Sequence, residues 1–154
     1  QFVFTHVRNP SINVLSLSEV ILFDAHGGRV AVRAASNPGG QPGNPMETPK
    51  AVIDGSTASK WLDMNFHGQA RLQLDISSTR HVAQYELFTA MGRHRGRDPT
   101  GWAFGILRRG AGEAGQDRFE VLSVISGVDP PPREAASYGR FNAVLLPPSP
   151  PLPP

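Results

Sequence analysis

Apolar and polar residues alternate along several short segments of the chain, a pattern typical of strands that bury one face. The clearest examples are residues 70–76 (ARLQLDI) and residues 2–7 (FVFTHV). Further segments are rich in β-branched, aromatic or aliphatic residues; they are residues 14–23, 29–34, 81–89, 101–107, 119–125 and 138–146. The pattern therefore predicts about eight strands and few helices.

Glycine and proline separate these segments. Residues 24–28 (DAHGG) have the chemistry of a tight, hairpin-like turn, and residues 36–49 contain four prolines, three glycines and two asparagines, which predicts a long loop. With 154 residues in all, the chain has room for one domain. We expect an all-β sandwich or barrel over residues 1–146.

The charge pattern limits the classes of partner. Fifteen basic residues face 13 acidic ones, and arginine clusters only within residues 93–97 and at Arg108–Arg109. This is too little for the basic face of a nucleic-acid-binding protein. The longest apolar runs are far shorter than the ~20 residues that cross a bilayer, so we expect no membrane insertion. Cysteine is absent, which excludes disulfides and thiolate metal sites within the chain.

Enzyme signatures are also missing from the sequence. It contains no nucleophile elbow, phosphate-binding glycine loop or zinc-binding HExxH motif. Asp and Glu are scattered over the predicted strands and turns, without the paired arrangement that would suggest glycoside hydrolysis. We therefore expect a binding protein and not an enzyme.

Four segments carry a resemblance to a known family. They are residues 17–24 (LSEVILFD), 36–40 (SNPGG), 51–63 (AVIDGSTASKWLD) and 97–102 (RDPTGW). In this order and spacing they resemble the discoidin, or factor 5/8 type C, domain, and especially family 32 carbohydrate-binding modules. The third segment is the most specific, because it matches the family pattern D-G-D-x-x-T-x-W at Asp54, Gly55, Ser59 and Trp61. The resemblance implies an all-β, discoidin-like jelly-roll β-sandwich with a galactose-binding-like fold. A tryptophan in this motif usually packs into the core and only rarely stacks on a sugar, so we expect Trp61, and similarly Trp102, to face inward.

The resemblance also implies a structural calcium ion. Asp54 and Ser59 would contribute side chains, Ala51 and Ser56 would contribute carbonyl groups, and Glu19 matches the glutamate that completes the family's site. Ser56 stands where the family has a second aspartate, so one negative charge is missing. The alternative is an Asx-turn in which Asp54 bonds to its own backbone and Glu19 caps a strand edge.

The charged loop of residues 91–98 (MGRHRGRD) is the candidate ligand-binding segment. Arginine and histidine side chains at the end of a sheet can hold sugar hydroxyls or an anionic group. The candidate residues are Arg93, His94, Arg95 and Arg97. In the alternative interpretation the loop is solvated and Arg97 pairs with Asp98 or Glu47. His26 and His67, which lack metal-ligating neighbours in the sequence, are expected at the surface.

Residues 147–154 (PPSPPLPP) predict a polyproline II tail or linker that cannot join a sheet. Its spacing is similar to that of hydroxyproline-rich cell-wall and ciliary-surface glycoproteins. Taken together, these features predict a module that binds a glycan or glycoprotein outside the cell or at its surface. The alternative is a structural subunit that docks onto other proteins in a larger assembly, such as a fibre or a cilium. A lipid-headgroup binder is a third option, but the loops are polar.

Overall fold

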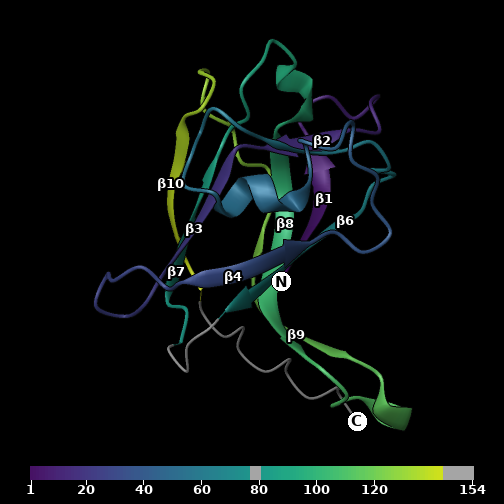
Figure 1. Cartoon of the computed structure of the whole chain (residues 1–154), viewed down its shortest axis with the longest axis vertical. Coiled ribbons are helices and arrows are strands. Elements are labelled where there is room, and N and C mark those ends of the chain that lie inside the picture. Colours follow the sequence, from purple (N-terminus) through teal and green to yellow (C-terminus); the bar gives the residue numbers. More distant parts are fainter. Residues whose placement is uncertain (77–80, 144–154) are drawn as a thin grey trace, which may run out of the picture.

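The computed structural model describes residues 1–76 and 81–143. Ten antiparallel strands form three sheets in this part of the chain, which contains no α-helix. Three short 3₁₀ segments connect strands; they are η1 (Pro49–Ile53), η2 (Arg95–Arg97) and η3 (Glu113–Gly115). The predicted all-β class is confirmed, as is the low helix content (Figure 1).

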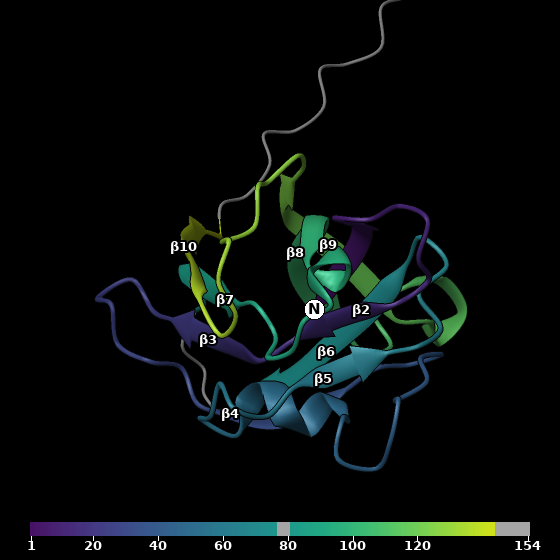
Figure 2. The same cartoon turned by 90° about the horizontal axis from the view of Figure 1, so that it is seen from above.

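The strands of the largest sheet follow the order β4-β6-β1-β8-β9. They are β4 (Val32–Ser36), β6 (Ala70–Ile76), β1 (Phe2–Val7), β8 (Pro99–Arg108) and β9 (Arg118–Ile125). A three-stranded sheet contains β10 (Ser137–Asn142), β7 (Gln84–Phe88) and β3 (Glu19–Phe23) in this order. The smallest sheet pairs β2 (Leu15–Leu17) with β5 (Trp61–Asp63). Seen from above, β3, β7 and β10 group on one side of the molecule, apart from β8 and β9 (Figure 2).

Alternation along the central strands places apolar side chains between the sheets. Phe2 of β1 lies opposite Leu72 of β6 and Phe104 of β8 in register, and all three side chains are buried. Since side chains of directly opposed residues project to the same face of a sheet, these three form one row. The hydrophobic pattern of residues 2–7 and 70–76 predicted both strands with the bounds that the structure has.

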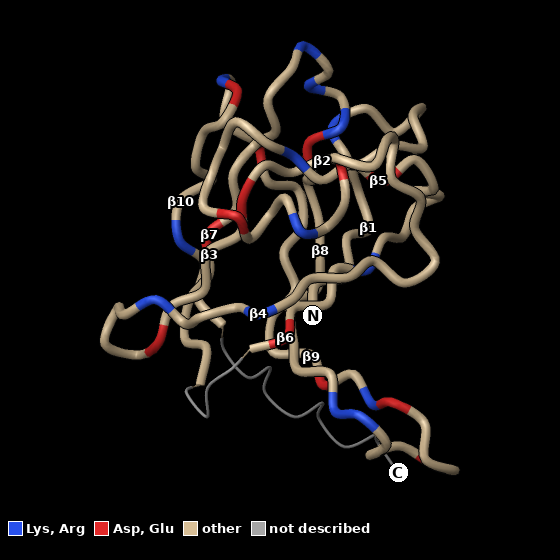
Figure 3. Tube along the Cα trace, viewed as in Figure 1, with Lys and Arg blue, Asp and Glu red and all other residues tan. Residues whose placement is uncertain are grey.

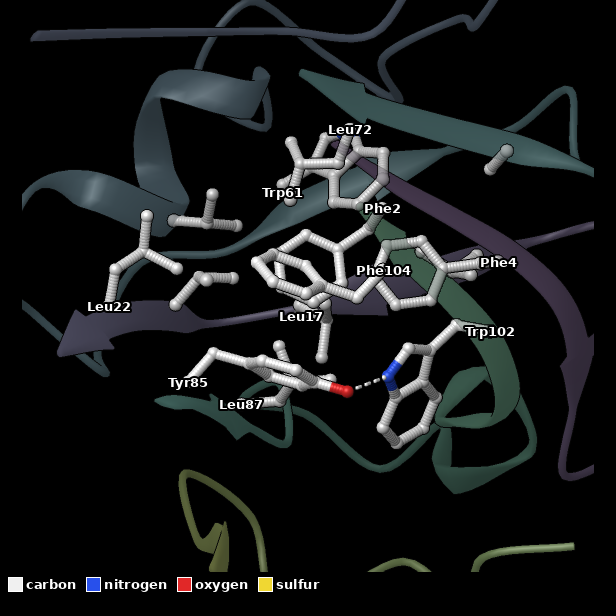
Figure 4. Packing of buried hydrophobic residues seen from close by; sticks show 14 of the residues in the cluster. Phe2, Phe4, Leu17, Leu22, Trp61, Leu72, Tyr85, Leu87, Trp102 and Phe104 are labelled. Carbon is white, nitrogen blue, oxygen red and sulfur yellow. Dashed lines mark hydrogen bonds between the residues drawn. The ribbon is translucent and has the colours of Figure 1, made fainter. Parts of the chain in front are cut away.

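Aromatic side chains connect the two larger sheets across the core. The ring of Tyr85 on β7 lies 5.0 Å from that of Phe2 in an edge-to-face arrangement and 4.5 Å from that of Phe104. The indole Nε1–H of Trp102 donates a hydrogen bond of 2.9 Å to the hydroxyl of Tyr85, and both residues are fully buried (Figure 4). The inward orientation predicted for Trp61 and Trp102 is confirmed, and the packing is that of a β-sandwich-like fold.

Two of the predicted elements differ from the structure. Residues 14–23 form two strands and not one, because Ser18 lies between β2 and β3 and the chain changes sheet there. The buried hydroxyl of Ser18 donates to the carbonyl of Thr89 at 2.7 Å. The chain can therefore change sheet at Ser18 without leaving this hydroxyl group unpaired. The strand expected at residues 29–34 is shifted to β4, although the turn at residues 24–28 is confirmed by the bond from the Asp24 N–H to the Gly28 carbonyl (2.8 Å).

The predicted last strand, residues 138–146, corresponds to β10 over its first part. Residues 144–146 and the predicted polyproline II tail at residues 147–154 lie outside the described residues. No helix in the described part of the chain is long and apolar enough to cross a membrane.

The first prediction concerns the buried polar pair. Replacing Tyr85→Phe keeps the ring but leaves the Trp102 N–H without its acceptor, so the free energy of unfolding should fall by about 1–3 kcal/mol. Urea denaturation measures this change, with the exposed His67→Ala as the control. A loss no larger than that of the control would show that the hydrogen bond does not hold the sheets together.

Candidate functional site

The loop that connects η1 to β5 folds around the side chain of Asp54. One carboxylate oxygen, Oδ1, accepts the N–H of Ser56 at 2.9 Å, which makes an Asx-turn. The other, Oδ2, accepts the hydroxyl of Ser59 at 2.6 Å, and this hydroxyl oxygen lies 3.1 Å from the Ser56 carbonyl. Gly55 has φ +79°, which lets the chain reverse at this point without strain. Three kinds of oxygen atom therefore meet within one short turn.

Glu19, the first residue of β3, faces this turn from the neighbouring sheet. Its side chain is buried, with 6% of its surface exposed, and its Oε2 atom has no hydrogen-bond partner. Burial, and to a smaller extent the nearby charge of Asp54, raise the pKa of Glu19 to about 7, although the N–H groups of Gly55 and Ser56 and the charge of Arg29 oppose this rise. The structure thus brings together four of the five residues predicted to hold calcium.

The donor set of this cluster fits a hard cation. It consists of two carboxylates, a hydroxyl and a carbonyl, which are the ligands that Ca²⁺ prefers, and it lacks the histidine and thiolate ligands that zinc favours. A cation would satisfy the unpartnered Oε2 of Glu19 and offset its repulsion with Asp54. In the described part of the chain, no three His, Cys, Asp or Glu side chains cluster as metal ligands.

The remaining predicted ligands are placed as follows. Ala51 is buried in η1, where its N–H donates to the carbonyl of Thr48 at 3.0 Å. The hydroxyl of Ser56, which replaces the expected aspartate, accepts the N–H of Ala58 at 3.1 Å. The substitution therefore provides a second local turn in place of a charge. The Asx-turn of the alternative interpretation is present, and it coexists with the cluster of oxygen atoms.

The arginine loop, residues 91–98, projects from the end of the sandwich (Figure 3). Arg93 and His94 are exposed, whereas Arg95 and Arg97 are half-buried. The guanidinium of Arg95 donates to the carbonyl of Pro132, and the Gly96 carbonyl accepts the N–H of Asn9 at 2.9 Å. These contacts fix the base of the loop and leave its tip, residues 93–94, available to a ligand.

The two acidic residues that the alternative interpretation paired with Arg97 form ion pairs with other residues in the structure. Asp98 pairs with Arg8 at 3.3 Å, and Glu47 pairs with Lys60 at 3.5 Å. Arg8 also donates to the carbonyls of Pro130 and Pro131, at 3.1 and 3.4 Å. Burial raises the pKa of Asp98 to about 6, although the Arg8 guanidinium opposes this rise. The loop is anchored, but through Arg8, a partner far away in the sequence.

Sequence reasoning missed a polar pocket of about 250 Å³ beside β5. One wall is the loop after β4 and the other is the turn between β5 and β6 with the start of β6. The lining residues are Asn37, Pro38, Gly39, Gly40, Asp63, Asn65, Gln69, Ala70 and Arg71. The segment SNPGG was recognised as part of the family resemblance and as a loop, but nothing in its pattern indicates that it lies against residues 63–71.

The carboxylate of Asp63 organises this Asn37–Asp63 pocket. Its Oδ1 atom accepts the N–H groups of Gln41 (3.0 Å) and Asn65 (2.9 Å), and only 1% of the residue's surface is exposed. The side-chain amide of Asn65 donates to the Gly39 carbonyl at 2.8 Å, which joins the two walls. An aspartate directly after the apolar Trp61-Leu62 pair was the one available signal, since a carboxylate at the end of a buried strand needs donors.

A larger cavity of about 450 Å³ lies between β4, β6 and β8. Most of its lining is apolar. Polar side chains on its rim bond to one another: the Gln73 amide donates to the Gln1 Oε1 atom at 2.9 Å, and Arg109 donates to the Gln73 Oε1 atom at 2.9 Å. The side chains of Gln1, Gln73 and Arg109 are thus already engaged with one another.

His26 and His67 are exposed, as predicted. Comparisons of the chain with protein-family models, with curated proteins and with solved structures return no match.

The second prediction follows from the burial of Glu19. The folded protein retains the Glu19 proton up to about pH 7, whereas the unfolded chain releases it near the ordinary value of 4.5. In calcium-free buffer the free energy of unfolding should therefore fall, by an amount on the order of 3 kcal/mol, as the pH rises from about 4.5 to 7.

Glu19→Gln should remove this part of the pH dependence, because glutamine stays neutral. Other groups that titrate in this range, such as Asp98, are common to both proteins, so the difference between the two stability curves isolates Glu19. Denaturant titrations at several pH values with EGTA measure it. Parallel curves for the wild type and the variant would contradict the prediction.

Proposed function

We propose that the chain is a discoidin-like jelly-roll β-sandwich that binds a carbohydrate or glycoprotein, without catalysing a reaction, at a cell surface or in the extracellular matrix. The observation that carries the proposal is the approach of Glu19 to the turn at residues 54–59. Glu19 lies on β3, whereas the turn lies in the loop before β5, and these are the two segments that the family resemblance assigned to one calcium site. Their meeting supports the resemblance independently of the sequence pattern.

The sheet arrangement is compatible with this assignment. Antiparallel strands in two larger, facing sheets bury a single aromatic core, and the loops gather at the ends of the sandwich. In such a fold a rigid framework presents variable loops, which are the usual place for binding residues. A module that only binds a ligand needs neither a moving segment nor a reactive side chain at its site.

In the proposed module the tip of the arginine loop contacts the ligand. Arg93 and His94 are exposed there and supply hydrogen-bond donors suited to sugar hydroxyls or to a carboxylate or sulfate group. Arg95 has a positioning role, because its bond to the Pro132 carbonyl holds the base of the loop. Arg97 lies half-buried between the tip and β8.

Calcium has a structural role in this proposal. Glu19, Asp54 and Ser59 would hold the ion with side chains, and Ser56 and Ala51 with carbonyl groups. Bound there, the ion would link β3 to the loop before β5 and neutralise two carboxylates. The missing aspartate at position 56 predicts weaker binding than in a site with three carboxylates.

A structural docking subunit is the second candidate function. Strand β9 is an edge of the largest sheet, and its Val124 side chain is 59% exposed. An edge strand offers unpaired backbone groups to another chain. The exposed large apolar residues of the described ranges include no Phe or Leu, however, so this surface supports the docking function less strongly.

The third prediction concerns calcium. Adding Ca²⁺ to chelator-treated protein should raise its melting temperature, because a ligand that binds only the folded state stabilises it. Glu19→Gln and Asp54→Asn should each reduce or abolish this rise, whereas Asp24→Asn, in the turn after β3, should keep it. Differential scanning calorimetry measures the effect. A wild type whose melting temperature is the same with Ca²⁺ and with EGTA would exclude the calcium site.

The fourth prediction concerns the glycan. On a glycan array, the wild-type protein should bind a defined set of sugars, and the double variant Arg93→Ala/His94→Ala should lose at least about tenfold in affinity, equivalent to 1.4 kcal/mol. Arg118→Ala, which removes an exposed arginine from the first position of β9, is the matched control, because β9 lies away from the arginine loop (Figure 3). If the wild type binds no glycan on the array, carbohydrate binding is rejected and the docking subunit is favoured.

A further inference from the structure

We propose that the Asn37–Asp63 pocket is a second binding site, which holds one neutral, polyhydroxylated sugar residue. The inference rests on the proposed carbohydrate-binding function, but it assigns sugar contacts to residues outside the arginine loop. The pocket lies between the loop after β4 and the turn between β5 and β6, whereas the arginine loop precedes β8. The two sites therefore use different segments of the chain.

The lining of the pocket indicates the class of ligand. Its side chains are mainly amides, a carboxylate and a guanidinium, and none is aromatic. Pockets for drug-sized apolar molecules are larger and mostly apolar. A cavity of about 250 Å³ that offers donors and acceptors on opposite walls matches a small molecule with several hydroxyl groups, recognised by hydrogen bonds and not by ring stacking.

One of the lining residues has an acceptor without a hydrogen-bond partner. The Oδ1 atom of Asn37 is buried and has no hydrogen-bond partner. Burying an amide oxygen without a donor costs about 1–3 kcal/mol, and proteins rarely leave one unpaired. A hydroxyl group of a sugar in the pocket would donate to this oxygen and remove the cost.

The side chain of Asn37 packs against the backbone of Gly40. A Cβ atom at position 40 would lie only 1.7 Å from the Asn37 amide nitrogen, so the side chain occupies space that only glycine leaves free. The Met64 N–H donates to the Gln41 carbonyl at 2.7 Å, and Pro42 bridges to Asp63. The polar groups are thus arranged before a ligand arrives, which lowers the entropy lost on binding.

The charges of the pocket favour a neutral ligand. The carboxylate of Asp63 and the guanidinium of Arg71 have opposite sign and are both part of the lining. Asp63 disfavours an acidic sugar close to it, and Arg71 disfavours an amine. A neutral hydroxyl group can instead donate to a carboxylate and accept from a guanidinium.

The test is a titration of the full chain with free monosaccharides, followed by the shifts of its backbone and side-chain amide NMR signals. The probes are galactose, glucose, mannose and N-acetylglucosamine, with glucuronic acid as an acidic comparison. At least one neutral sugar should shift the signals of residues 37–41 and 63–71. Asn37→Ala should weaken its binding about tenfold, the effect of one lost hydrogen bond of about 1.4 kcal/mol.

Three further variants complete the design. Gln69→Ala changes an exposed lining residue and should weaken binding severalfold without affecting folding. Gly40→Ala should displace Asn37 and weaken binding at least as much as Asn37→Ala does. The control is Asn44→Ala, in the same loop, where the Asn44 side chain accepts the Met46 N–H (2.8 Å) and does not line the pocket.

The outcomes separate this inference from the proposed function. If sugars bind the wild type, but Asn37→Ala and Gln69→Ala bind them as tightly as Asn44→Ala does, the pocket is not a subsite and the proposed function stands. If glucuronic acid binds more tightly than every neutral sugar, the neutral assignment is wrong. If neither the array nor the titration detects any sugar, the proposed function and the subsite both fail.

Discussion

The contact between Trp102 and Tyr85 constrains the rest of the structure. The indole N–H and the phenolic hydroxyl are buried among aromatic rings, where neither group has access to water. Their hydrogen bond forms only when β8 and β7 lie at one separation and one register. Since many of the loops begin at the end of a strand in one of these two sheets, this geometry also constrains where those loops lie. Hydrophobic burial alone, which is not directional, would allow the sheets to slide.

Strand β5 links the oxygen cluster around Asp54 and the Asn37–Asp63 pocket to this core. It is only three residues long, Trp61 to Asp63, and all three are buried. The turn around Asp54 ends just before it, and the Asn37–Asp63 pocket begins at its last residue. Trp61 also contacts the aromatic cluster, with its ring 6.0 Å from that of Phe4. A change in the core at this point therefore affects the oxygen cluster and the pocket together.

Local sequence signals predicted the parts of the molecule that depend on local chemistry. The alternation of apolar and polar residues predicted β1 and β6 with the bounds that they have in the structure, and the Asp54-Gly55 pair indicated the turn that forms there. The split at Ser18 was not predictable, because a serine fits a half-buried strand and its bond to Thr89 depends on the fold. The meeting of Glu19 with Asp54 came only from the family resemblance, since no local rule pairs these residues. The pairing of Arg8 with Asp98 and the pocket around Asn37 depend on contacts between distant segments, which periodicity does not encode.

The contacts of Arg8 also have a consequence for how the arginine loop can change. One guanidinium joins the end of β1, the start of β8 and the segment at Pro130–Pro131. Substitutions at the base of the loop would disturb all three, whereas residues 93 and 94 lie beyond these anchors. Sequence diversity should therefore be tolerated at the tip and restricted below it, as in a scaffold that carries an interchangeable peptide. A library randomised only at residues 93 and 94 could change the ligand specificity of the module and leave the contacts of Arg8 intact.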